Sequence, residues 1–509
     1  MPKQFEMSRV NVTDLFFEHA ERSPERCAIV NGNARISYGE LSTQVKATAA
    51  YFQSKGIAKG DRVLVFVPMG IDLYRTVLAL FDIGATVVFL DEWVSRERLD
   101  VCCKLAKCKA WIGGWKVKIL SVLSSELRKT PLKLGLSYDV NQLYSKTDTS
   151  DDTIALITFT TGSTGIPKAA IRTHAHLKSQ FDALIEKIDP KEGEVDMPVL
   201  PIVLLINLGA GCTSVIAPFK SKKAEKMKPE IMVKLLQNEN VNRLVSSPYF
   251  AIRVAEYCTQ KNVQLPNLSK VFTGGAPVFP DESRILDEGF QNAKVSIVYG
   301  STEAEPISAI TSDLLKREIL EDKQGLCVGP VHRTTEILIL PITDDNILVT
   351  STTELESMQL KTGEIGEICV AGSHVLSDYL DNPEAVLRNK IKVEGNCWHR
   401  TGDSGFIGED GFLYLTGRAA NLVEINQRIY SPFLFEYNIK QIDEVISGTI
   451  LKINSLIVLF VEFNVTVSDT SFLKEKFPFV DKIIVGKLPK DPRHFSKIDY
   501  GKLKENYLK

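Results

Sequence analysis

Between residue 28 and about residue 310, short apolar runs alternate with longer amphipathic runs. The run RVLVFVP at 62–68 precedes the amphipathic run DLYRTVLALFDIGA at 72–85, and TVVFLD follows at 86–91. Three later runs are also β-rich and end in small residues, namely NRLVSSP (242–248), KVFTGG (270–275) and VSIVYGS (295–301). This rhythm is typical of parallel βαβ units, which place ligand loops at the strand ends. We therefore predict an α/β fold.

The pattern changes after residue 325. The runs TEILILPI (335–342), NILVTST (346–352) and GEIGEICVAG (363–372) are β-rich, with glycine-rich turns and little helix between them. The stretch RTGDSGFIGEDGFLYLTGR at 400–418 has five glycines, and about ninety residues of mixed character follow it. We predict an N-terminal domain, residues 1–417, of parallel βαβ sheets plus a β subdomain. A small α+β C-terminal domain would occupy residues 418–509.

The segment at 197–219, MPVLPIVLLINLGAGCTSVIAPF, carries no charge and is long enough to span a bilayer. Its composition argues against a membrane span, because it contains Pro198, Pro201, Asn207 and two glycines. It also lacks a basic flank on its N-terminal side. We therefore predict a buried strand and helix of a large α/β core.

Bulk composition excludes some classes of function. The 509 residues include 61 Lys and Arg against 63 Asp and Glu, for a net charge of −2, so no excess of positive charge favours nucleic acid. The nine cysteines are scattered, and Cys102, Cys103 and Cys108 form no C-x-x-C pair, which predicts reduced thiols and no zinc site. The N-terminus MPKQFEMSRV has no apolar signal core, so we expect a cytoplasmic protein.

The first stretch with candidate chemistry is ITFTTGSTGIPKAA at 157–170. Its spacing is not the Walker pattern, which has four residues between its glycines and Ser or Thr after the lysine. Hydroxyls, the backbone N–H groups of a glycine turn and a lysine can nevertheless surround an anion. A polar surface loop is the alternative. The candidate phosphate ligands are Thr160, Thr161, Gly162, Ser163, Thr164, Gly165 and Lys168.

The second stretch is VYGSTEAEP at 298–306, where a strand is followed by two hydroxyls and an acid. Tyr299 could stack on a base and Thr302 could contact phosphate. Glu303 offers oxygen ligands, which Mg²⁺ prefers. The alternative is a strand-to-helix turn with a cap.

Two further stretches complete the set of candidates. In RTGD at 400–403, the carboxylate of Asp403 suits a ribose diol, because a carboxylate accepts two hydroxyl hydrogen bonds. An ordinary aspartate turn is the alternative. The lysine-rich stretch LPKDPRHFSKIDYGKL at 488–503 could equally be a solvated tail.

These four stretches, in this order, resemble the adenylate-forming superfamily of acyl-CoA synthetases, luciferases and adenylation domains of peptide synthetases. The resemblance covers nearly the whole chain. The matching stretches are TTGSTGIPK (160–168) for the family's T-S-G-T-T-G-x-P-K, YGSTE (299–303), TGD (401–403), Gly417-Arg418, ISYGELS (36–42), GGAP (274–277) and GEIGEI (363–368).

The resemblance implies roles for individual residues. The loop at 160–168 would hold the β- and γ-phosphates of ATP, which leave as pyrophosphate. Glu303 would hold Mg²⁺, and Asp403 would bind the ribose hydroxyls with Arg418 nearby. Lys497 matches the adenylation lysine of the family. The remaining nucleotide contacts would come from Gly275, Ala276, Pro277, Tyr299, Gly300, Ser301 and Thr302, the last of which is also a catalytic candidate.

The resemblance also implies the reaction. A substrate carboxylate attacks the α-phosphate of ATP, and because both are anions the site needs Mg²⁺ and a lysine where charge builds up. The product is an acyl-adenylate, after which the mobile C-terminal domain rotates for a second step. The region at 197–219 corresponds to the acyl pocket of the family, and its Val, Leu and Ile residues suggest an apolar, fatty-acid-like substrate. Plain core packing is the alternative.

The stretch after Gly417-Arg418 departs from members that use CoA or a carrier protein. Those members have a hinge residue, a lysine and a glycine where this chain has Ala420, Glu424 and Gln427. Together with STEAEPIS (301–308) and DPRHFSKI (491–498), these departures resemble the olefin β-lactone synthetase branch. In that branch the β-hydroxyl of an adenylated acid closes a lactone, so no external acceptor is needed.

Three classes of function therefore remain to be compared. An acid-activating ligase of the acyl-CoA synthetase type, with β-lactone formation as its alternative, accounts for every motif. A binding protein that kept the fold but lost catalysis is disfavoured by the presence of Glu303, Asp403 and Lys497. A P-loop NTPase is disfavoured by the missing Walker spacing.

Overall fold

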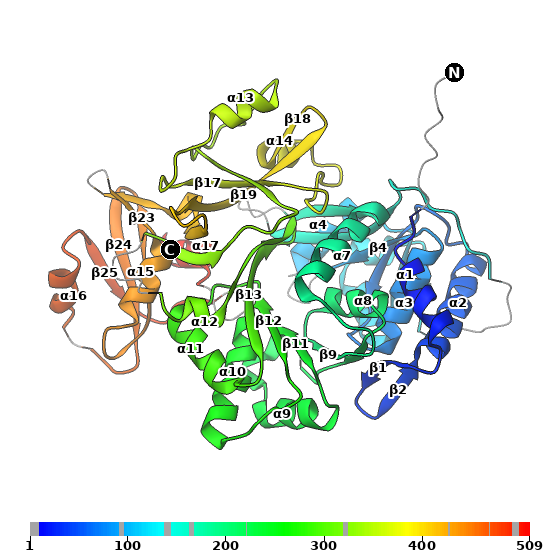
Figure 1. Cartoon of the computed structure of the whole chain (residues 1–509). Helices are drawn as coiled ribbons and strands as arrows, with labels where there is room; N and C mark the ends of the chain where they lie inside the picture. Colours follow the sequence, from blue (N-terminus) through cyan, green and yellow to red (C-terminus); the bar gives the residue numbers. More distant parts are fainter. Residues whose placement is uncertain are drawn as a thin grey trace.

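The computed structural model of the chain describes residues 10–90, 96–136, 144–161, 167–219, 221–318, 324–425, 428–467, 469–490 and 498–508 (Figure 1). Its architecture confirms the predicted α/β fold. A large N-terminal domain contains two mixed sheets with helices and an antiparallel β subdomain, and a smaller C-terminal domain follows.

The larger mixed sheet has eight strands. Its six inner strands run parallel, whereas the two edge strands pair antiparallel to their neighbours. Inner strands of this kind are covered on both faces, which explains their nearly continuous apolar sequences. The order is β14 (Ala304–Thr311), β13 (Lys294–Ser301), β12 (Lys270–Gly274), β11 (Arg243–Ser246), β9 (Val195–Pro198), β10 (Thr213–Val215), β1 (Cys27–Asn31) and β2 (Ala34–Ser37).

The second mixed sheet has six strands, of which five are parallel and one edge strand is antiparallel. Its order is β6 (Leu132–Leu134), β5 (Ala110–Gly113), β3 (Arg62–Phe66), β4 (Thr86–Phe89), β7 (Ile154–Thr161) and β8 (Pro167–Thr173). β7 and β13 are each the last parallel strand before an antiparallel edge strand. The two motif-bearing turns therefore occupy equivalent positions in the two sheets.

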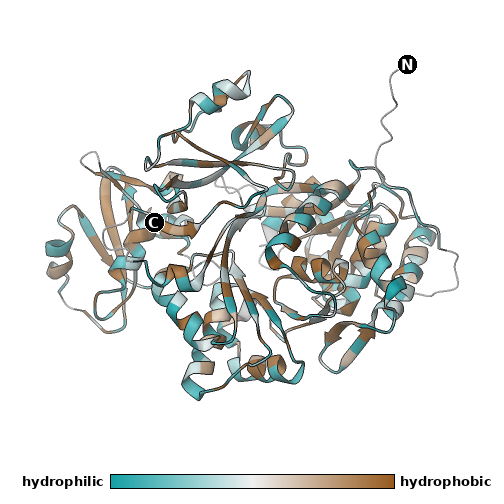
Figure 2. Cartoon of the chain, in the orientation of Figure 1, coloured by the Kyte–Doolittle hydropathy of each residue, from teal (hydrophilic) through white to brown (hydrophobic). Residues whose placement is uncertain are grey.

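Helices cover the two mixed sheets. They are α1 (Asp14–Arg22), α2 (Tyr38–Ser54), α3 (Ile71–Asp82), α4 (Arg96–Ala106), α5 (Trp115–Leu123), α6 (Ser125–Lys129), α7 (His174–Ile188), α8 (Pro201–Gly209), α9 (Pro229–Asn238), α10 (Pro248–Lys261) and α11 (Pro280–Gly289). Figure 2 shows the consequence for side-chain polarity: brown residues are frequent in the inner strands, while many outer helix faces are teal.

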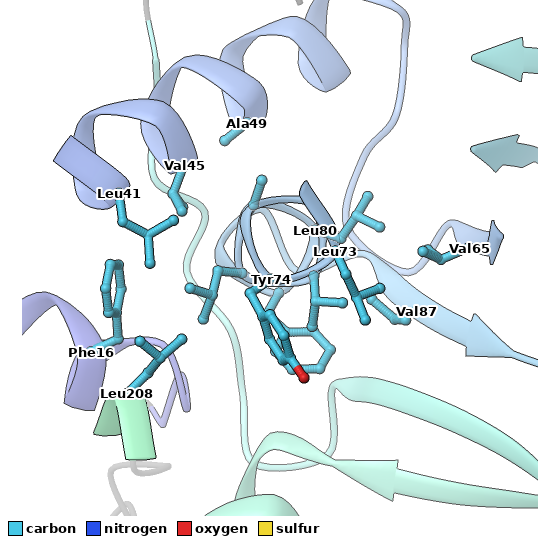
Figure 3. Packing of buried hydrophobic residues seen from close by; sticks show 14 of the residues in the cluster. Phe16, Leu41, Val45, Ala49, Val65, Leu73, Tyr74, Leu80, Val87 and Leu208 are labelled. Atoms are coloured by element: carbon cyan, nitrogen blue, oxygen red, sulfur yellow. The ribbon is translucent and has the colours of Figure 1, made fainter. Parts of the chain in front are cut away.

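The largest part of the hydrophobic core surrounds α3. Nine of the twelve residues of this helix are buried, which is the pattern of a helix enclosed on all sides. Figure 3 shows how the core is assembled from distant segments. Side chains of α3 meet α1 and α2 on one side and the second mixed sheet on the other, through Phe16, Leu41, Val45, Leu73, Tyr74, Leu80, Val65 and Val87.

The uncharged segment at 197–219 forms the end of β9, then α8 and β10, as predicted. Among the described residues, no helix is long and apolar enough to cross a membrane. The polar exception in α8, Asn207, is buried and donates to Asp196 Oδ2 at 2.6 Å. Arg243 in turn donates to Asn207 Oδ1 at 2.7 Å, so the residue that departs from an apolar helix is the centre of a buried polar network.

The β subdomain is antiparallel. Its strands are β15 (Leu326–Gly329), β20 (Leu413–Arg418), β19 (Asn396–Ile407), β17 (Gly366–Ala371) and β16 (Glu336–Leu340), in that order, with β18 (Lys390–Val393) on β19. The short helices α13 (Thr352–Ser357) and α14 (Pro383–Asn389) lie in its connections. The prediction of a β subdomain after residue 325 is thus confirmed, although the run NILVTST at 346–352 forms no strand and leads into α13.

The C-terminal residues have their own apolar core, built on a three-stranded sheet of β23 (Val445–Ile453), β24 (Leu456–Phe463) and β25 (Lys482–Val485). The other elements are β21 (Val423–Ile425), β22 (Arg428–Tyr430), α15 (Pro432–Ile439), α16 (Ser471–Lys476) and α17 (Tyr500–Leu508). α15 packs on the N-terminal domain, where Phe279 stacks on Tyr437 with ring centroids 5.0 Å apart. The boundary at 417/418 stays a prediction.

Candidate functional site

The hairpin of β7 and β8 carries the first motif. In its antiparallel register Thr160 lies opposite Lys168, so both residues lie at the end of the hairpin where β7 leads into β8. Lys168 Nζ donates to Asn389 Oδ1 at 3.2 Å and lies 5.1 Å from the ring centroid of Tyr379. Burial lowers the pKa of Lys168, while the carboxylate of Glu303 acts in the opposite direction.

A carboxylate faces this hairpin from the other sheet. Glu303 Oε1 accepts hydrogen bonds from Thr160 Oγ1 at 3.4 Å and from Tyr379 Oη at 3.2 Å. Burial is also the main reason that the pKa of Tyr379 is raised, so its hydroxyl stays protonated and donates. Both hydroxyls donate to Oε1, and neither of them occupies Oε2. Glu303 is thus held in place with one oxygen directed elsewhere.

The turn that carries Glu303 connects two strands, β13 and β14. The alternative of a strand-to-helix turn is therefore wrong. Ser301 Oγ accepts from the backbone N–H groups of Glu303 at 3.3 Å and Ala304 at 3.2 Å, which stabilises the turn. The backbone oxygen of Thr302 accepts from Arg172 at 2.6 Å, while the Thr302 side chain is exposed.

Asp403 forms a second cluster on the β subdomain. Tyr299 Oη donates to Asp403 Oδ2 at 2.9 Å, and Arg418 Nε lies 3.2 Å from Asp403 Oδ1. The antiparallel register of β19 and β20 places Asp403 directly opposite Arg418. Burial, reinforced by the Asp403 carboxylate, raises the pKa of Tyr299. Oδ2 thus accepts one hydrogen bond and Oδ1 is part of an ion pair, and both oxygens have lone pairs for further donors.

A buried ion pair fixes the turn before Asp403. Arg400 and Glu367 lie 2.6 Å apart, and both side chains are almost fully buried. The second oxygen of Glu367 accepts from the backbone N–H of Gly402 at 3.2 Å. Gly402 has φ +70°, a conformation that favours glycine. The backbone that presents Asp403 is therefore held by a salt bridge that sequence reasoning did not identify.

The GGAP stretch begins with the last residue of β12, the parallel neighbour of β13. Gly274 pairs with Val298, the residue before Tyr299. A Cβ on Gly274 would lie 2.5 Å from the Val298 carbonyl oxygen, so only glycine allows this close approach. Gly275 follows with φ +83°. Gly275, Ala276 and Pro277 are thus brought beside the strand that carries Tyr299.

The two clusters are close enough to influence one another. The charges of both Glu303 and Arg418 act on the pKa of Lys168, and both Asp403 and Glu303 act on that of Arg418. Two carboxylates and two cations therefore face a common region between the sheets and the β subdomain. The Arg418 guanidinium is held by Asp403, whose charge raises its pKa.

Several predicted residues lie outside the described part of the chain. They are Gly162, Ser163, Thr164, Gly165, Gln427 and Lys497, and the side chain of Thr161 is not described either. Of the other two departures from CoA-using relatives, Ala420 follows β20 in a 3₁₀ turn and Glu424 is exposed on β21. Neither Ala420 nor Glu424 contributes a hydrogen bond to the two clusters described above.

Sequence reasoning missed Tyr379 and Lys390. Lys390 is the first residue of β18 and only 3% exposed, and its ammonium donates to the Leu376 carbonyl. Its Nζ lies 5.4 Å from the Tyr379 ring centroid, so this ring contacts two lysine cations. Burial lowers the pKa of Lys390 to about 8. Strand alternation in KIKV would place Lys390 on the same face as the exposed Lys392, so no local sequence pattern marks this lysine as inward-facing.

The apolar residues of α8 pack near Tyr299. Val203 and Ile206 are buried in one cluster with Val245 of β11 and Phe272 of β12. Val298, next to Tyr299, packs against the same cluster. Ile206 also lines a narrow cavity of about 40 Å³ between α8, α1, α3 and α7, which is too small for a bound ligand.

Comparison with known proteins places this geometry in a family. The model of the AMP-binding enzyme family matches residues 16–380. The chain is 30% identical over 417 residues to olefin β-lactone synthetase of Xanthomonas campestris, covering 76% of this chain and 73% of that protein. It is 22% identical over 459 residues to 4-coumarate–CoA ligase 1 of Arabidopsis thaliana, covering 83% and 77%.

The fold is also found among solved structures. O-succinylbenzoate coenzyme A synthetase from Bacillus subtilis, in complex with AMP, superimposes with a TM-score of 0.80 at 18% identity, over 97% of this chain and 98% of that chain. The family match covers more than half of the chain and includes the turns that carry Lys168 and Glu303. The chain therefore belongs to the AMP-binding enzyme family and is an adenylate-forming, acid-activating enzyme.

Proposed function

We propose that the protein activates an apolar carboxylic acid with ATP, forming an acyl-adenylate and releasing pyrophosphate, and then transfers the acyl group as an acyl-CoA synthetase does. The observation that carries this proposal is the position of Glu303. It is fixed by Thr160 from the phosphate hairpin and by Tyr379, and it acts on the pKa of both Lys168 and Arg418. A carboxylate among these cations suits a triphosphate with its metal ion.

The donor set fits Mg²⁺. Among the described residues, no group of three or more His, Cys, Asp or Glu side chains could hold a metal ion on its own. Mg²⁺ typically takes one or two carboxylates and completes its shell with water and substrate phosphates. Glu303 is the carboxylate for this role, and the bound ion would neutralise charge on the phosphates.

The nucleotide would extend from Lys168 to Asp403. Lys168 faces the leaving phosphates, while Asp403 accepts hydrogen bonds from the ribose hydroxyls through its remaining lone pairs. Arg418 and Tyr299 keep Asp403 in place. The adenine would lie against Gly275, Ala276 and Pro277, beside Tyr299. Lys497 would bring the cation that touches both the carboxylate and the α-phosphate.

The C-terminal domain would rotate between the two steps. Its present contact with the N-terminal domain includes the stack of Phe279 on Tyr437. A rotation must separate these rings and also withdraw Phe433 and Leu434 of α15 from the N-terminal core cluster that they join. The apolar residues of α8 beside Val298 support an apolar acid as substrate.

A second candidate for the second step is β-lactone formation. Ala420, Glu424 and Gln427 favour it. The identity of 30% to an olefin β-lactone synthetase adds little, because a Bacillus subtilis protein named as an acyl-CoA ligase is 28% identical over a larger share of this chain. In this reaction the β-hydroxyl oxygen of the adenylate attacks the carbonyl carbon. The bond from that carbon to the phosphate oxygen breaks, AMP leaves with the bonding electrons, and the hydroxyl proton goes to solvent.

Product analysis distinguishes these functions. Fatty, aryl and β-hydroxy acids would be incubated with ATP and Mg²⁺, with and without CoA, and the products identified by mass spectrometry. An acyl-CoA that forms only with CoA establishes a thioester ligase. Loss of water from a β-hydroxy acid, indifferent to CoA, establishes the lactone route.

The control for this experiment is Lys497→Ala, which we expect to lower either activity by about 10²–10³-fold. Absence of acid-dependent exchange between ATP and pyrophosphate, over the whole panel, would support a catalytically silent binding protein instead. Phosphate release without any acid would contradict adenylation altogether.

We expect Lys390 to make kcat/KM for MgATP decrease at alkaline pH. Its pKa of about 8 lies below the usual lysine value, so the ammonium is charged below that pH and loses its charge above it. We predict that kcat/KM for MgATP falls as pH rises through about 8, because the Tyr379 ring loses one of its two cations. Lys390→Met should lower kcat/KM about fivefold below pH 8 and abolish that limb.

The matched control is Lys392→Met, two positions along β18, where the lysine is exposed. It should leave the pH profile of the unmodified protein unchanged. The groups that act on Lys390 are Tyr379, Glu303, Lys168, Asp378, Cys397 and His399. A Lys390→Met profile with the same alkaline limb would assign the limb to Lys168 instead.

A further inference from the structure

Helix α5 exposes an unusual concentration of large apolar side chains. Of its nine residues, Trp115, Ile119, Val122 and Leu123 are 67%, 54%, 69% and 48% exposed. The spacing of four, three and one residues is helical, so these side chains share one side of the helix. The opposite side is buried through Val117 and Ser121. α5 is therefore docked to the protein by one face and presents a second apolar face outward.

The helix belongs to the outer end of the second mixed sheet. Together with α6 it connects β5 to the edge strand β6, at the opposite end of this sheet from β8 and Lys168. Side chains of α4 and α5 cover the same core cluster, through Leu99, Cys102 and Val117. Val101 of α4 is exposed as well. The apolar face is thus separate from the nucleotide site.

The segment that carries this apolar face is rich in positive charge. Residues 98–133 contain nine Lys and Arg against two Asp and Glu, although the whole chain has a net charge of −2. Lys116 and Lys118 are exposed on α5 itself, and Lys116 Nζ lies 5.8 Å from the ring centroid of Trp115. Asp100, one of the two acids, is hydrogen-bonded to Ser124. Lys107 and Lys129 are paired with Asp381 and Glu126, whereas Lys104 and Lys133 are exposed like the two lysines of α5.

We propose that α5 is a docking surface for an anionic lipid bilayer. An apolar helix face with lysines beside it matches such a bilayer, whose acyl chains are apolar and whose headgroups are negatively charged. Tryptophan at the start of the helix is suited to the headgroup level, where its ring is partly buried and its N–H stays hydrated. The protein would lie on the membrane with α5 parallel to it. This binding is independent of the reaction proposed above.

The test is sedimentation of the full chain with lipid vesicles. Vesicles of phosphatidylglycerol and phosphatidylcholine should bind the protein, and raised salt should weaken the binding. Vesicles of phosphatidylcholine alone should bind it weakly. The fluorescence of Trp115 should shift to shorter wavelength on binding, and the shift should be absent in Trp115→Phe.

Two variants separate the contributions. Ile119→Glu with Val122→Glu should lower vesicle partitioning by at least about tenfold. Lys116→Gln with Lys118→Gln should lower it by about fivefold per lysine on anionic vesicles and leave binding to neutral vesicles unchanged. The control is Ile231→Glu with Leu348→Glu, which places the same charges at positions that are 44% and 74% exposed elsewhere. It should bind as the unmodified protein does.

Several results would overturn the proposal. They are absence of binding to anionic vesicles, equal binding to neutral ones, and unchanged binding of the Ile119/Val122 variant. A dimer in analytical ultracentrifugation that this variant abolishes, without vesicle binding, would make a second copy of the chain the occupant. All of the substituted positions are exposed, so thermal unfolding midpoints should stay within a few degrees and the variants should remain folded.

Discussion

Glu303→Gln is expected to lower acid-dependent exchange between ATP and pyrophosphate by about 10²–10³-fold. The substitution keeps an oxygen at the position of Oε1, so Thr160 and Tyr379 can still donate to the side chain. It removes the negative charge that balances Lys168 and Arg418 and the anionic oxygen proposed to hold Mg²⁺. The Mg²⁺ concentration for half-maximal exchange should rise in the same variant. Initial rates over a magnesium titration measure both effects.

Tyr379→Phe is the matched control for this substitution. It keeps the ring between Lys168 and Lys390 and removes only the hydroxyl that donates to Glu303. Loss of one hydrogen bond to a charged group predicts a decrease of about tenfold, well below the effect of Glu303→Gln. Exchange by Glu303→Gln within about threefold of the unmodified protein would show that this carboxylate is not part of the ATP site.

Local sequence patterns predicted the elements whose burial is visible in consecutive residues. Short apolar runs such as RVLVFVP became inner parallel strands because those strands are covered on both faces. The turn at 301–303 was harder, since hydroxyls and an acid suit a helix cap as well as a hairpin. The residues that follow this turn determine that it connects two strands. AEPISAIT forms β14, almost entirely buried along β13, because its small and β-branched residues pack there.

The supporting residues of the site could not be predicted in this way. Tyr379 reaches Glu303 across 76 positions of sequence, and Lys168 reaches Asn389 across 221. No local periodicity encodes contacts of that range. The residue type alone does not distinguish a buried lysine such as Lys390 from the many exposed lysines. Only the pairing of β18 with β19 places it inside. The motifs located the candidate ligands, whereas the packing that orients them required the structure.

Asn207 is another residue whose role could not be predicted from the sequence. In the sequence it served only as an argument against a membrane span, yet in the structure it connects Asp196 and Arg243. Arg243 is fully buried and lies 2.6 Å from Glu194 and 3.4 Å from Asp196. Burial raises the pKa of Asp196, and the guanidinium opposes that effect. The network joins α8 to β9 and β11, so it fixes the helix that lies beside the candidate acid pocket.

Arg243→Met is expected to lower the free energy of unfolding by about 3–5 kcal/mol, because it leaves the buried carboxylate of Asp196 without its cation. Urea unfolding at pH 7 measures this loss. The loss of unfolding free energy caused by Arg243→Met should be smaller at acid pH. Without Arg243 the pKa of Asp196 rises further above its unfolded value, so the stability of the variant is greatest where Asp196 is protonated and falls as pH rises through that pKa.

Two comparisons make this prediction specific to the buried charge. Lys270→Met removes a cation 3.1 Å from Glu194, but Lys270 is 24% exposed, so the loss should stay within about 1 kcal/mol. Adding Asp196→Asn to Arg243→Met should restore part of the stability, since it removes the unpaired charge while keeping a polar side chain beside Asn207. Equal losses of unfolding free energy for the Arg243 and Lys270 variants would instead indicate that the buried charge of Asp196 does not matter. In that case the packing of Asn207, and not its link to charged groups, would fix the position of α8.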